Sequence, residues 1–259
     1  VLRDRRRTHR RPPRRTHPRS GHHGPTPHRL SRDREAMTTL ARDPALGWHD
    51  QSADIPDFLR PLATAIDGVA ATRLTRFTPP DDGGRRAAVL ALFGESASGP
   101  DLLICERAHT MRSHAGQPAF PGGAIDDGDI DERAAALREA EEETGLDPAG
   151  VTVFGALPDL WVPVSGFIVS PMLGWWHHPV PVRAVDAAEV ASVHRVPIRE
   201  LADPAHRVRV RHPSGYIGFG FEVRGLLVWG FTAGLINGLL DLGGWAQPWD
   251  DARVVDLNA

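Results

Sequence analysis

Lysine is absent from this chain: all 30 basic residues among its 259 are arginines. Without a lysine amine, the protein cannot form a Schiff base with a carbonyl substrate or use the lysine of a phosphate-binding P-loop. The sequence therefore excludes both of these enzyme classes.

Cysteine and long apolar runs are also scarce. The single cysteine, Cys105, lies in the apolar run DLLIC, so no disulfide can form within the chain. We expect a buried, inert thiol and a reducing compartment, the cytoplasm. No stretch approaches the roughly 18 apolar residues of a membrane span. No apolar segment follows the basic N-terminus, so we expect neither a secretory signal nor a membrane partner.

The charge is divided unevenly along the chain. Residues 1–36 hold 12 Arg and 5 His against three acids, a net charge of +9, whereas the rest carries 18 Arg against 30 acids, or −12. We expect residues 1–36 to be disordered, because they have almost no apolar side chains to bury. They are either an arm for nucleic acid or an extension upstream of the true start at Met37. We favour the extension and expect no nucleic-acid partner.

Residues 37–259 are predicted to form one α/β domain. Apolar periodicity predicts helices over 55–74, 131–144 and 226–240, and strands over 87–93, 102–107, 151–157, 166–175, 191–196, 207–211 and 216–223. A turn at residues 213–215 is expected to close the last two strands into a hairpin. Strands and helices mixed in this order favour a sheet covered by helices.

A glycine turn at residues 121–123 leads into the predicted helix at 131–144, which is crowded with glutamates. At 100° per residue, Glu139, Glu142 and Glu143 fall within about 100° of arc, opposite Leu137. Glu141 points elsewhere. We expect Glu141 and Glu132 to be solvated residues without a role.

This arc of acids is disfavoured by its own electrostatics. Arg138 is the only basic residue spaced at i+3 or i+4 to form ion pairs with these acids, and it lies on the less favourable N-terminal side. Gly145 is expected to cap the C-terminus of the helix. The acids then also occupy the negative end of the helix dipole. Two carboxylates about 4 Å apart repel by roughly 1 kcal/mol in water and about 4 at an effective dielectric of 20. We therefore expect a hard cation, Mg²⁺ or Mn²⁺, to bind there.

The turn and helix resemble the box of the Nudix hydrolases. The matching residues are Gly123, Asp129, Arg138, Glu139, Glu142, Glu143, Gly145 and Leu146. There are two departures from the general pattern: Asp129 replaces a glutamate, and its distance to Arg138 is one residue longer than usual. Both are typical of one subgroup, the coenzyme A diphosphatases.

A segment upstream of the box also resembles that subgroup. In LLICERAHTMRSHAGQPAFPGG, residues 102–123, the matches are Arg107, Arg112, His114, Gly116, Gln117, Phe120, Pro121, Gly122 and Gly123. Glu106 is atypical for its position. A looser resemblance continues to Leu242, whereas residues 1–54 lie outside it.

The resemblance implies a Nudix fold, in which helices sandwich a mixed β-sheet, and metal-dependent hydrolysis of a small-molecule diphosphate. The leading hypothesis is cleavage of coenzyme A and its derivatives into 3′,5′-ADP and 4′-phosphopantetheine. One alternative is a broader hydrolase of ADP-ribose, NADH or damaged nucleotides. Another is a binding module of the same fold without turnover, although the intact glutamates argue against it.

Roles follow for the acidic residues. We expect Glu139 and Glu143 to be the principal metal ligands and Glu142 a third ligand or the base, and the resemblance adds the Gly123 carbonyl. Arg138 is expected to orient a glutamate through a bidentate pair. The catalytic residues are thus Glu139, Glu142 and Arg138, while the general base stays open between a helix glutamate and a later acid such as Asp186 or Glu189.

Substrate contacts are expected upstream of the helix. Arg107, Arg112 and His114 either contact the substrate phosphates, for which arginine is well suited, or brace the turn. Gly122, with Gly123, is expected to let the backbone approach metal or phosphate closely. Gln117 and Phe120 are predicted to be structural. The apolar C-terminal helix is compatible with a homodimer.

Overall fold

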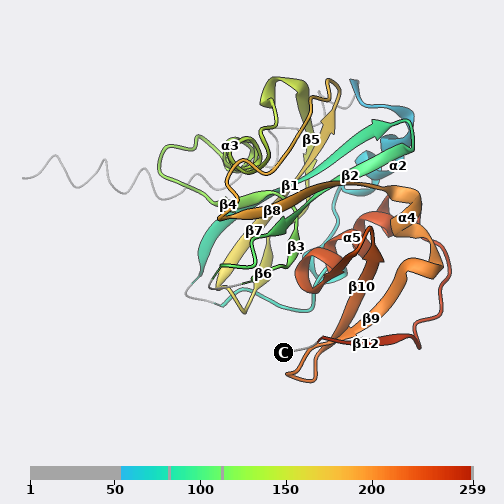
Figure 1. Ribbon diagram of the computed structural model, residues 1–259. Helices are drawn as coiled ribbons and strands as arrows, with labels where there is room; N and C mark the ends of the chain where they lie inside the picture. The colour runs from blue at the N-terminus through green and yellow to red at the C-terminus, as the bar shows by residue number, and fades with distance from the viewer. Residues whose placement is uncertain (1–53, 81–82, 112–113, 258–259) are drawn as a thin grey trace, which may run out of the picture. The chain divides into compact units, whose positions relative to one another are not determined.

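The fold is built on two β-sheets, one of eight strands and one of four, within the residues that the structure describes (Figure 1). This computed structural model describes residues 54–80, 83–111 and 114–257. The predicted extension at 1–36 and Arg112 lie outside the described residues.

The larger sheet is mixed. Its central strands β1 (Arg85–Ser96) and β7 (Phe167–Trp176) run parallel, paired from Arg85↔Phe167 to Phe93↔Trp175. The other pairs are antiparallel, and the main path has the order β3-β2-β1-β7-β5. The remaining strands are β2 (Gly99–Arg107), β3 (Pro118–Ala119), β4 (Gly122–Ala124), β5 (Val151–Ala156), β6 (Leu160–Val162) and β8 (Val190–Pro197).

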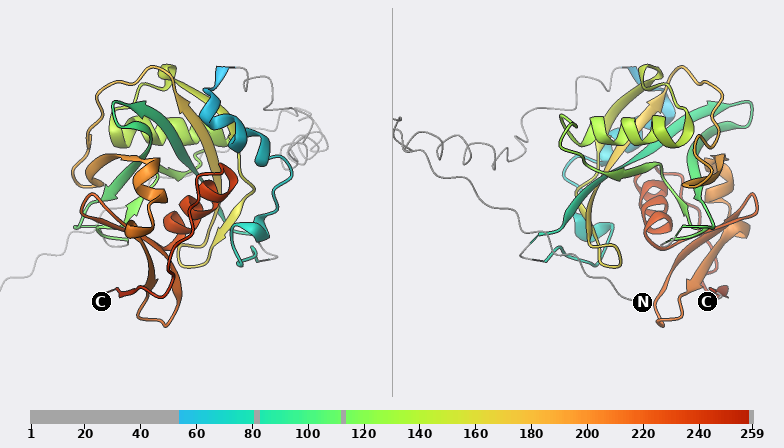
Figure 2. Two further views of the ribbon diagram at one scale, coloured as in Figure 1. Left: turned by 90° about the vertical axis from the view of Figure 1, so that its right-hand side faces the viewer. Right: turned by 60° about the vertical axis from the view of Figure 1, so that its left-hand side comes forward.

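Strand β1 explains why helices cover both faces of this sheet. Its side chains alternate between the faces. Leu90 and Leu92 pack with the alanines of helix α3 (Glu132–Thr144), whereas Phe93 packs on the other face with residues of α2 (Arg60–Ala65) and α5 (Gly230–Leu242). Figure 2 shows α3 and α5 on opposite sides of the sheet. The predicted mixed sheet between helices is confirmed.

The smaller sheet comes from the C-terminal part of the chain. It contains β9 (Arg207–Arg211), β10 (Ile217–Val223), β11 (Leu226–Trp229) and β12 (Val254–Asp256), in the order β11-β10-β9-β12. The predicted hairpin is confirmed as β9 and β10, and Phe221 packs into the same core as Leu235 and Leu239 of α5. The short helix α4 (Ile198–Ala202) links this sheet to β8.

Two predicted helices were wrong in extent. The segment 55–74 forms the 3₁₀ turns η2 (Asp57–Leu59) and η3 (Ala71–Arg73) around α2, because Gly68, at φ +70°, takes the chain out of helical geometry. The predicted helix at 226–240 begins only at Gly230, since residues 226–229 pair with β10 as strand β11. The 3₁₀ turns η4 (Pro148–Gly150) and η5 (Pro204–His206) complete the elements.

Short elements were missed because two or three residues are too few to show a period. Strands β3, β4, β6 and β12 are of this kind, and helix α4, with five residues, is little more than one turn. The predicted turn at residues 121–123 contains the start of β4. No helix in the described part of the chain has the length and apolar character needed to cross a bilayer.

Candidate active site

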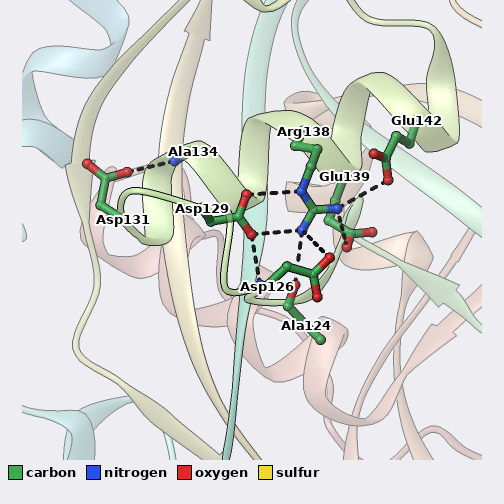
Figure 3. A network of polar contacts seen from close by, with 8 residues as sticks. All are labelled: Ala124, Asp126, Asp129, Asp131, Ala134, Arg138, Glu139 and Glu142. Atoms are coloured by element: carbon green, nitrogen blue, oxygen red, sulfur yellow. Dashed lines mark hydrogen bonds and ion pairs between the residues drawn. The ribbon is translucent and has the colours of Figure 1, made fainter. Parts of the chain in front are cut away.

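Helix α3 carries the acidic arc, and both of its ends are fixed locally. The Asp131 carboxylate caps the N-terminus by accepting a 2.7 Å hydrogen bond from the Ala134 N–H (Figure 3). Gly145, at φ +69°, ends the helix in the left-handed conformation. Asp131 is therefore the N-cap of the helix, and Asp129 is left for another contact.

The glutamates of the arc differ in exposure because α3 packs on the sheet through alanines. Ala135, Ala136 and Ala140 are fully buried. Glu143 lies at the edge of this packed face and is only 8% exposed, whereas the Glu139 and Glu142 side chains are 20% and 59% exposed. Glu141 is exposed, in agreement with its predicted position off the arc.

Arg138 is the centre of an ion-pair network (Figure 3). It binds Asp129 in a bidentate manner, Nε to Oδ1 at 3.0 Å and Nη2 to Oδ2 at 2.9 Å. Its Nη1 donates to Glu139 at 2.9 Å and to Glu142 at 3.2 Å. The hydrogen bond with Asp129 raises the pKa of Arg138 and holds the pKa of Asp129 below its ordinary value. Asp129, rather than a glutamate, is thus the bidentate partner.

This network compensates the helix charges more fully than the sequence indicated. The prediction considered only contacts at helical spacing, whereas a guanidinium has five N–H donors and also reaches the preceding loop. Arg138 holds Glu142 at the exposed end of the arc. In the part of the chain that the structure describes, no three acidic, histidine or cysteine side chains form a group placed to hold a metal ion. The three-carboxylate metal set stays a prediction.

Glu143 has a different environment. Among the described residues its carboxylate has one hydrogen-bond donor, the Gly122 N–H, at 3.1 Å from Oε2. Burial raises the pKa of Glu143 to about 7, the Gly122 hydrogen bond and Arg107 oppose the rise, and the charge of Glu139 adds to it. Burial likewise raises the pKa of Glu139, against the opposing effect of Arg138. Two neighbouring carboxylates thus share a site that disfavours their charge.

The backbone of β4 lies close to strand β1 at Gly122 and close to helix α3 at Gly123. A Cβ on Gly122, whose φ is +153°, would lie 2.3 Å from the Ala88 carbonyl oxygen. A Cβ on Gly123 would lie 2.5 Å from the carboxyl carbon of Glu139. Both distances are far inside van der Waals contact. The backbone therefore approaches the glutamates closely, while its approach to metal or phosphate stays a prediction.

The upstream residues are placed unevenly. Arg107 ends β2 near Glu143, whose pKa it lowers, and its Nε is buried with no hydrogen-bond partner among the described residues. His114, at φ +57°, has its Nδ1 2.7 Å from the Gln117 side-chain oxygen. Phe120 is buried in the core, which confirms its structural role. The Cys105 thiol is buried, and burial raises its pKa.

The two later acids, Asp186 and Glu189, lie on the loop between β7 and β8. The Val185 N–H donates to the Glu143 carbonyl at 3.1 Å, which brings this loop to the helix. Glu189 is exposed and close enough for its charge to raise the pKa of Glu143. The Asp186 side chain accepts from the Ala188 N–H at 2.8 Å. Glu189 is thus a later acid whose charge acts on the buried glutamate, and the general base stays open.

Sequence reasoning missed a second network at the start of α3. The Arg86 Nη2 donates to Glu132 at 3.0 Å, to Asp159 at 3.1 Å and to Ser170 at 3.2 Å. It ties the first turn of the helix to β1 and β7. The expectation that Glu132 has no role was therefore wrong, because the partner lies 46 residues away in the sequence and no local pattern reveals it.

Comparison with known proteins decides the family. The model of the NUDIX domain matches residues 84–214, half of the chain and the part that contains β1, β4 and α3. The chain belongs to the Nudix family. It is accordingly a hydrolase of pyrophosphate bonds in nucleoside-diphosphate-linked substrates, a class of enzymes that generally uses divalent metal ions.

Curated relatives agree with this assignment. The chain is 43% identical over 162 residues to an uncharacterized Nudix hydrolase, NudL, of Cronobacter sakazakii, and 42% identical over 162 residues to NudL of Escherichia coli K12. Each match covers 60% of this chain and 81% of the relative.

Solved structures give more distant matches. A Nudix hydrolase of M. smegmatis, RenU, matches with a TM-score of 0.43 and 16% identity over 66% of this chain and 96% of that one. The NUDIX domain of Shewanella oneidensis NrtR, complexed with ADP ribose, matches with a TM-score of 0.38 and 17% identity over 50% of this chain and 84% of that one.

The donors at the end of the arc fit a divalent ion. Glu143 and Glu139 supply carboxylate oxygens, the ligands that hard cations prefer. Each has a pKa raised by burial, and neither has a basic side chain that neutralises it alone, since Arg138 is shared with Asp129. A divalent cation beside β4 would offset the repulsion between them.

Alanine substitutions of the two glycines of β4 are expected to affect different properties, activity in one case and stability in the other. Gly123→Ala is expected to lower activity by roughly 100-fold with little change in stability, because its Cβ would displace the Glu139 carboxylate. Gly122→Ala is expected to destabilise the fold by about 2 kcal/mol or more, because its Cβ would meet the backbone of β1. Turnover assays and urea unfolding of both variants test this. Equal effects of the two substitutions on activity and stability would contradict it.

The raised pKa of Glu143 predicts that the stability of the metal-free protein depends on pH. Because folding raises its pKa from 4.5 to about 7, the protonated folded form is favoured and its contribution is complete below 4.5. The contribution is lost as the pH rises through about 7. The free energy of unfolding in EDTA should fall by up to about 3 kcal/mol over this range. Urea unfolding of Glu143→Gln, which cannot titrate, should lack this fall; an identical pH profile would refute the assignment.

Proposed function

We propose that this protein hydrolyses the diphosphate bond of coenzyme A and its derivatives, giving 3′,5′-ADP and 4′-phosphopantetheine. The observation that carries the proposal is the position of Arg107. This residue belongs to the upstream segment that resembles coenzyme A diphosphatases, and it lies near enough to Glu143 to lower its pKa. The segment typical of the subgroup is thus joined to the acidic helix.

In this proposal Glu139, Glu143 and the Gly123 carbonyl hold Mg²⁺ or Mn²⁺, and Glu142 is a third ligand or the base. The ion neutralises the diphosphate and helps to orient the attacking water. Arg138 acts through the carboxylates: its pair with Asp129 anchors it to the loop, and its Nη1 holds Glu139 and Glu142. Since Glu142 is the most exposed of the three glutamates, it is the one most open to solvent water.

The substrate phosphates are proposed to contact Arg107, Arg112, His114 and the Gly122 backbone. An arginine side chain whose Nε has no partner retains donors for an anion, and its planar guanidinium suits phosphate. Gln117 fixes the ring of His114 through their hydrogen bond. The buried thiol of Cys105 is consistent with the proposed cytoplasmic location, and a homodimer stays a prediction.

The substrate is tested with the full chain. Protein incubated with coenzyme A, ADP-ribose or dNTPs, in Mg²⁺ or Mn²⁺, should release 3′,5′-ADP from coenzyme A faster than it cleaves the other two. Chromatography of the products measures this. Intact coenzyme A alongside cleaved ADP-ribose would contradict the substrate but leave the hydrolase assignment in place.

Two glutamate variants test the assignment of the site in the same assay. Glu143→Gln should lower turnover by roughly 100-fold or more, a loss typical of removing one charge-stabilising group. Glu141→Gln, two residues away on the same helix but exposed and off the arc, is the matched control and should keep full activity. Equal activity of the two variants would refute the role of Glu143.

A further inference from the structure

Strand β9 carries three arginines on one face, because residues two apart point the same way. Two of them have carboxylate partners from the C-terminal segment: Arg209 pairs with Asp251 at 3.2 Å, and Arg211 pairs with Asp256 at 2.9 Å. Arg207 is the most buried of the three, at 3% exposed, yet it has no ion-pair partner among the described residues.

The surroundings of Arg207 compensate its charge only in part. Its Nη2 donates to the Asn237 side-chain oxygen, and its Nε is buried without a hydrogen-bond partner. The guanidinium carbon lies 4.8 Å from the centre of the Trp249 ring and 5.4 Å from that of Phe221. Asp241 adds a carboxylate charge nearby but no ion pair among the described residues, so the buried guanidinium is only partly compensated. A bound anion would stabilise its charged form.

An open cavity of about 330 Å³ lies beside this arginine. It is lined from β9 and β10 by Arg207, Arg209 and Phe219, from α5 by Asn237 and Asp241, and by the segment 246–251. Helix α5 packs on the sheet face opposite α3 (Figures 1 and 2). The cavity, which residues of α5 line, is therefore separate from the acidic arc.

The acids of the cavity limit what it can hold. Asp251 is paired with Arg209, and Asp241 accepts a hydrogen bond from the Asn237 amide at 3.3 Å. With two carboxylates beside two arginines, the lining favours one oxyanion of low charge at Arg207 and disfavours a polyanion such as a nucleotide or a nucleic acid.

We propose that this cavity is a second ligand site, in which Arg207 binds a single oxyanion group, a phosphate or a carboxylate, of a small molecule. Asn237 positions the guanidinium, and Trp249 covers it. The site is distinct from the diphosphate site, and the anionic metabolite would bind against strands β9 and β10 of the smaller sheet.

The anion can be tested by thermal unfolding of the full chain in EDTA, which removes metal from the acidic arc. Inorganic phosphate and acetate serve as separate probes, each compared with chloride at equal ionic strength. The unfolding midpoint of the wild-type protein should rise by about 3 °C with at least one of them. The probe that produces the rise distinguishes a phosphate from a carboxylate ligand.

Asn237→Asp provides the sharpest variant. It is nearly isosteric and places a carboxylate against the Arg207 guanidinium, so it should remove the anion-dependent rise. Arg207→Gln, which removes the charge, should also lose the rise. Arg211→Ala, on the same face of β9 but outside the cavity lining, is the matched control and should respond like the wild type. An unchanged wild-type midpoint, or equal rises in all four proteins, would overturn the proposal.

Discussion

The close packing of α3 on β1 and β4 is the contact on which the site depends. Ala135, Ala136 and Ala140 form the buried face of the helix, and Gly122 and Gly123 form the facing strand. Neither glycine could carry a Cβ without a collision. These small residues place two glutamates against a strand backbone, so they determine the geometry of the site as much as the acids do.

Arg138 and burial divide the charge of the helix between two regions. Arg138 gathers Asp129, Glu139 and Glu142 into one network at the partly exposed side. Glu143, on the buried side, receives only a backbone N–H and the field of Arg107. The negative charge left between Glu139 and Glu143 is the reason why a divalent ion suits this end of the helix. The opposite imbalance exists at Arg207, where a buried positive charge has no ion-pair partner among the described residues.

The sequence predicted the parts of the fold that have a strong local period. The run in β1 is apolar at successive positions because both of its faces are buried, and the acidic arc was evident from helical spacing. The box residues indicated the family that the comparison then established. The glycine turn before the helix also marked where backbone and carboxylates meet.

Other features depend on contacts between distant segments and left no local signal. The pairs Arg138–Asp129 and Arg86–Glu132 form only when a loop or a strand reaches the helix. The alternation RVRVR in β9 is typical of a half-exposed strand, so nothing in it marks Arg207 as buried beneath Trp249. Strand β11 was assigned to a helix because LLVW is apolar throughout, and its pairing with β10 decides otherwise.

Anomalous scattering from a crystal of the full-length protein grown with Mn²⁺ measures most directly whether α3 holds a divalent ion. The predicted result is an anomalous peak within bonding distance of carboxylate oxygens of Glu139 and Glu143, on the side of the helix that faces Gly123. A peak bound elsewhere, or no peak at a saturating Mn²⁺ concentration, would contradict the assignment of these glutamates as the metal ligands.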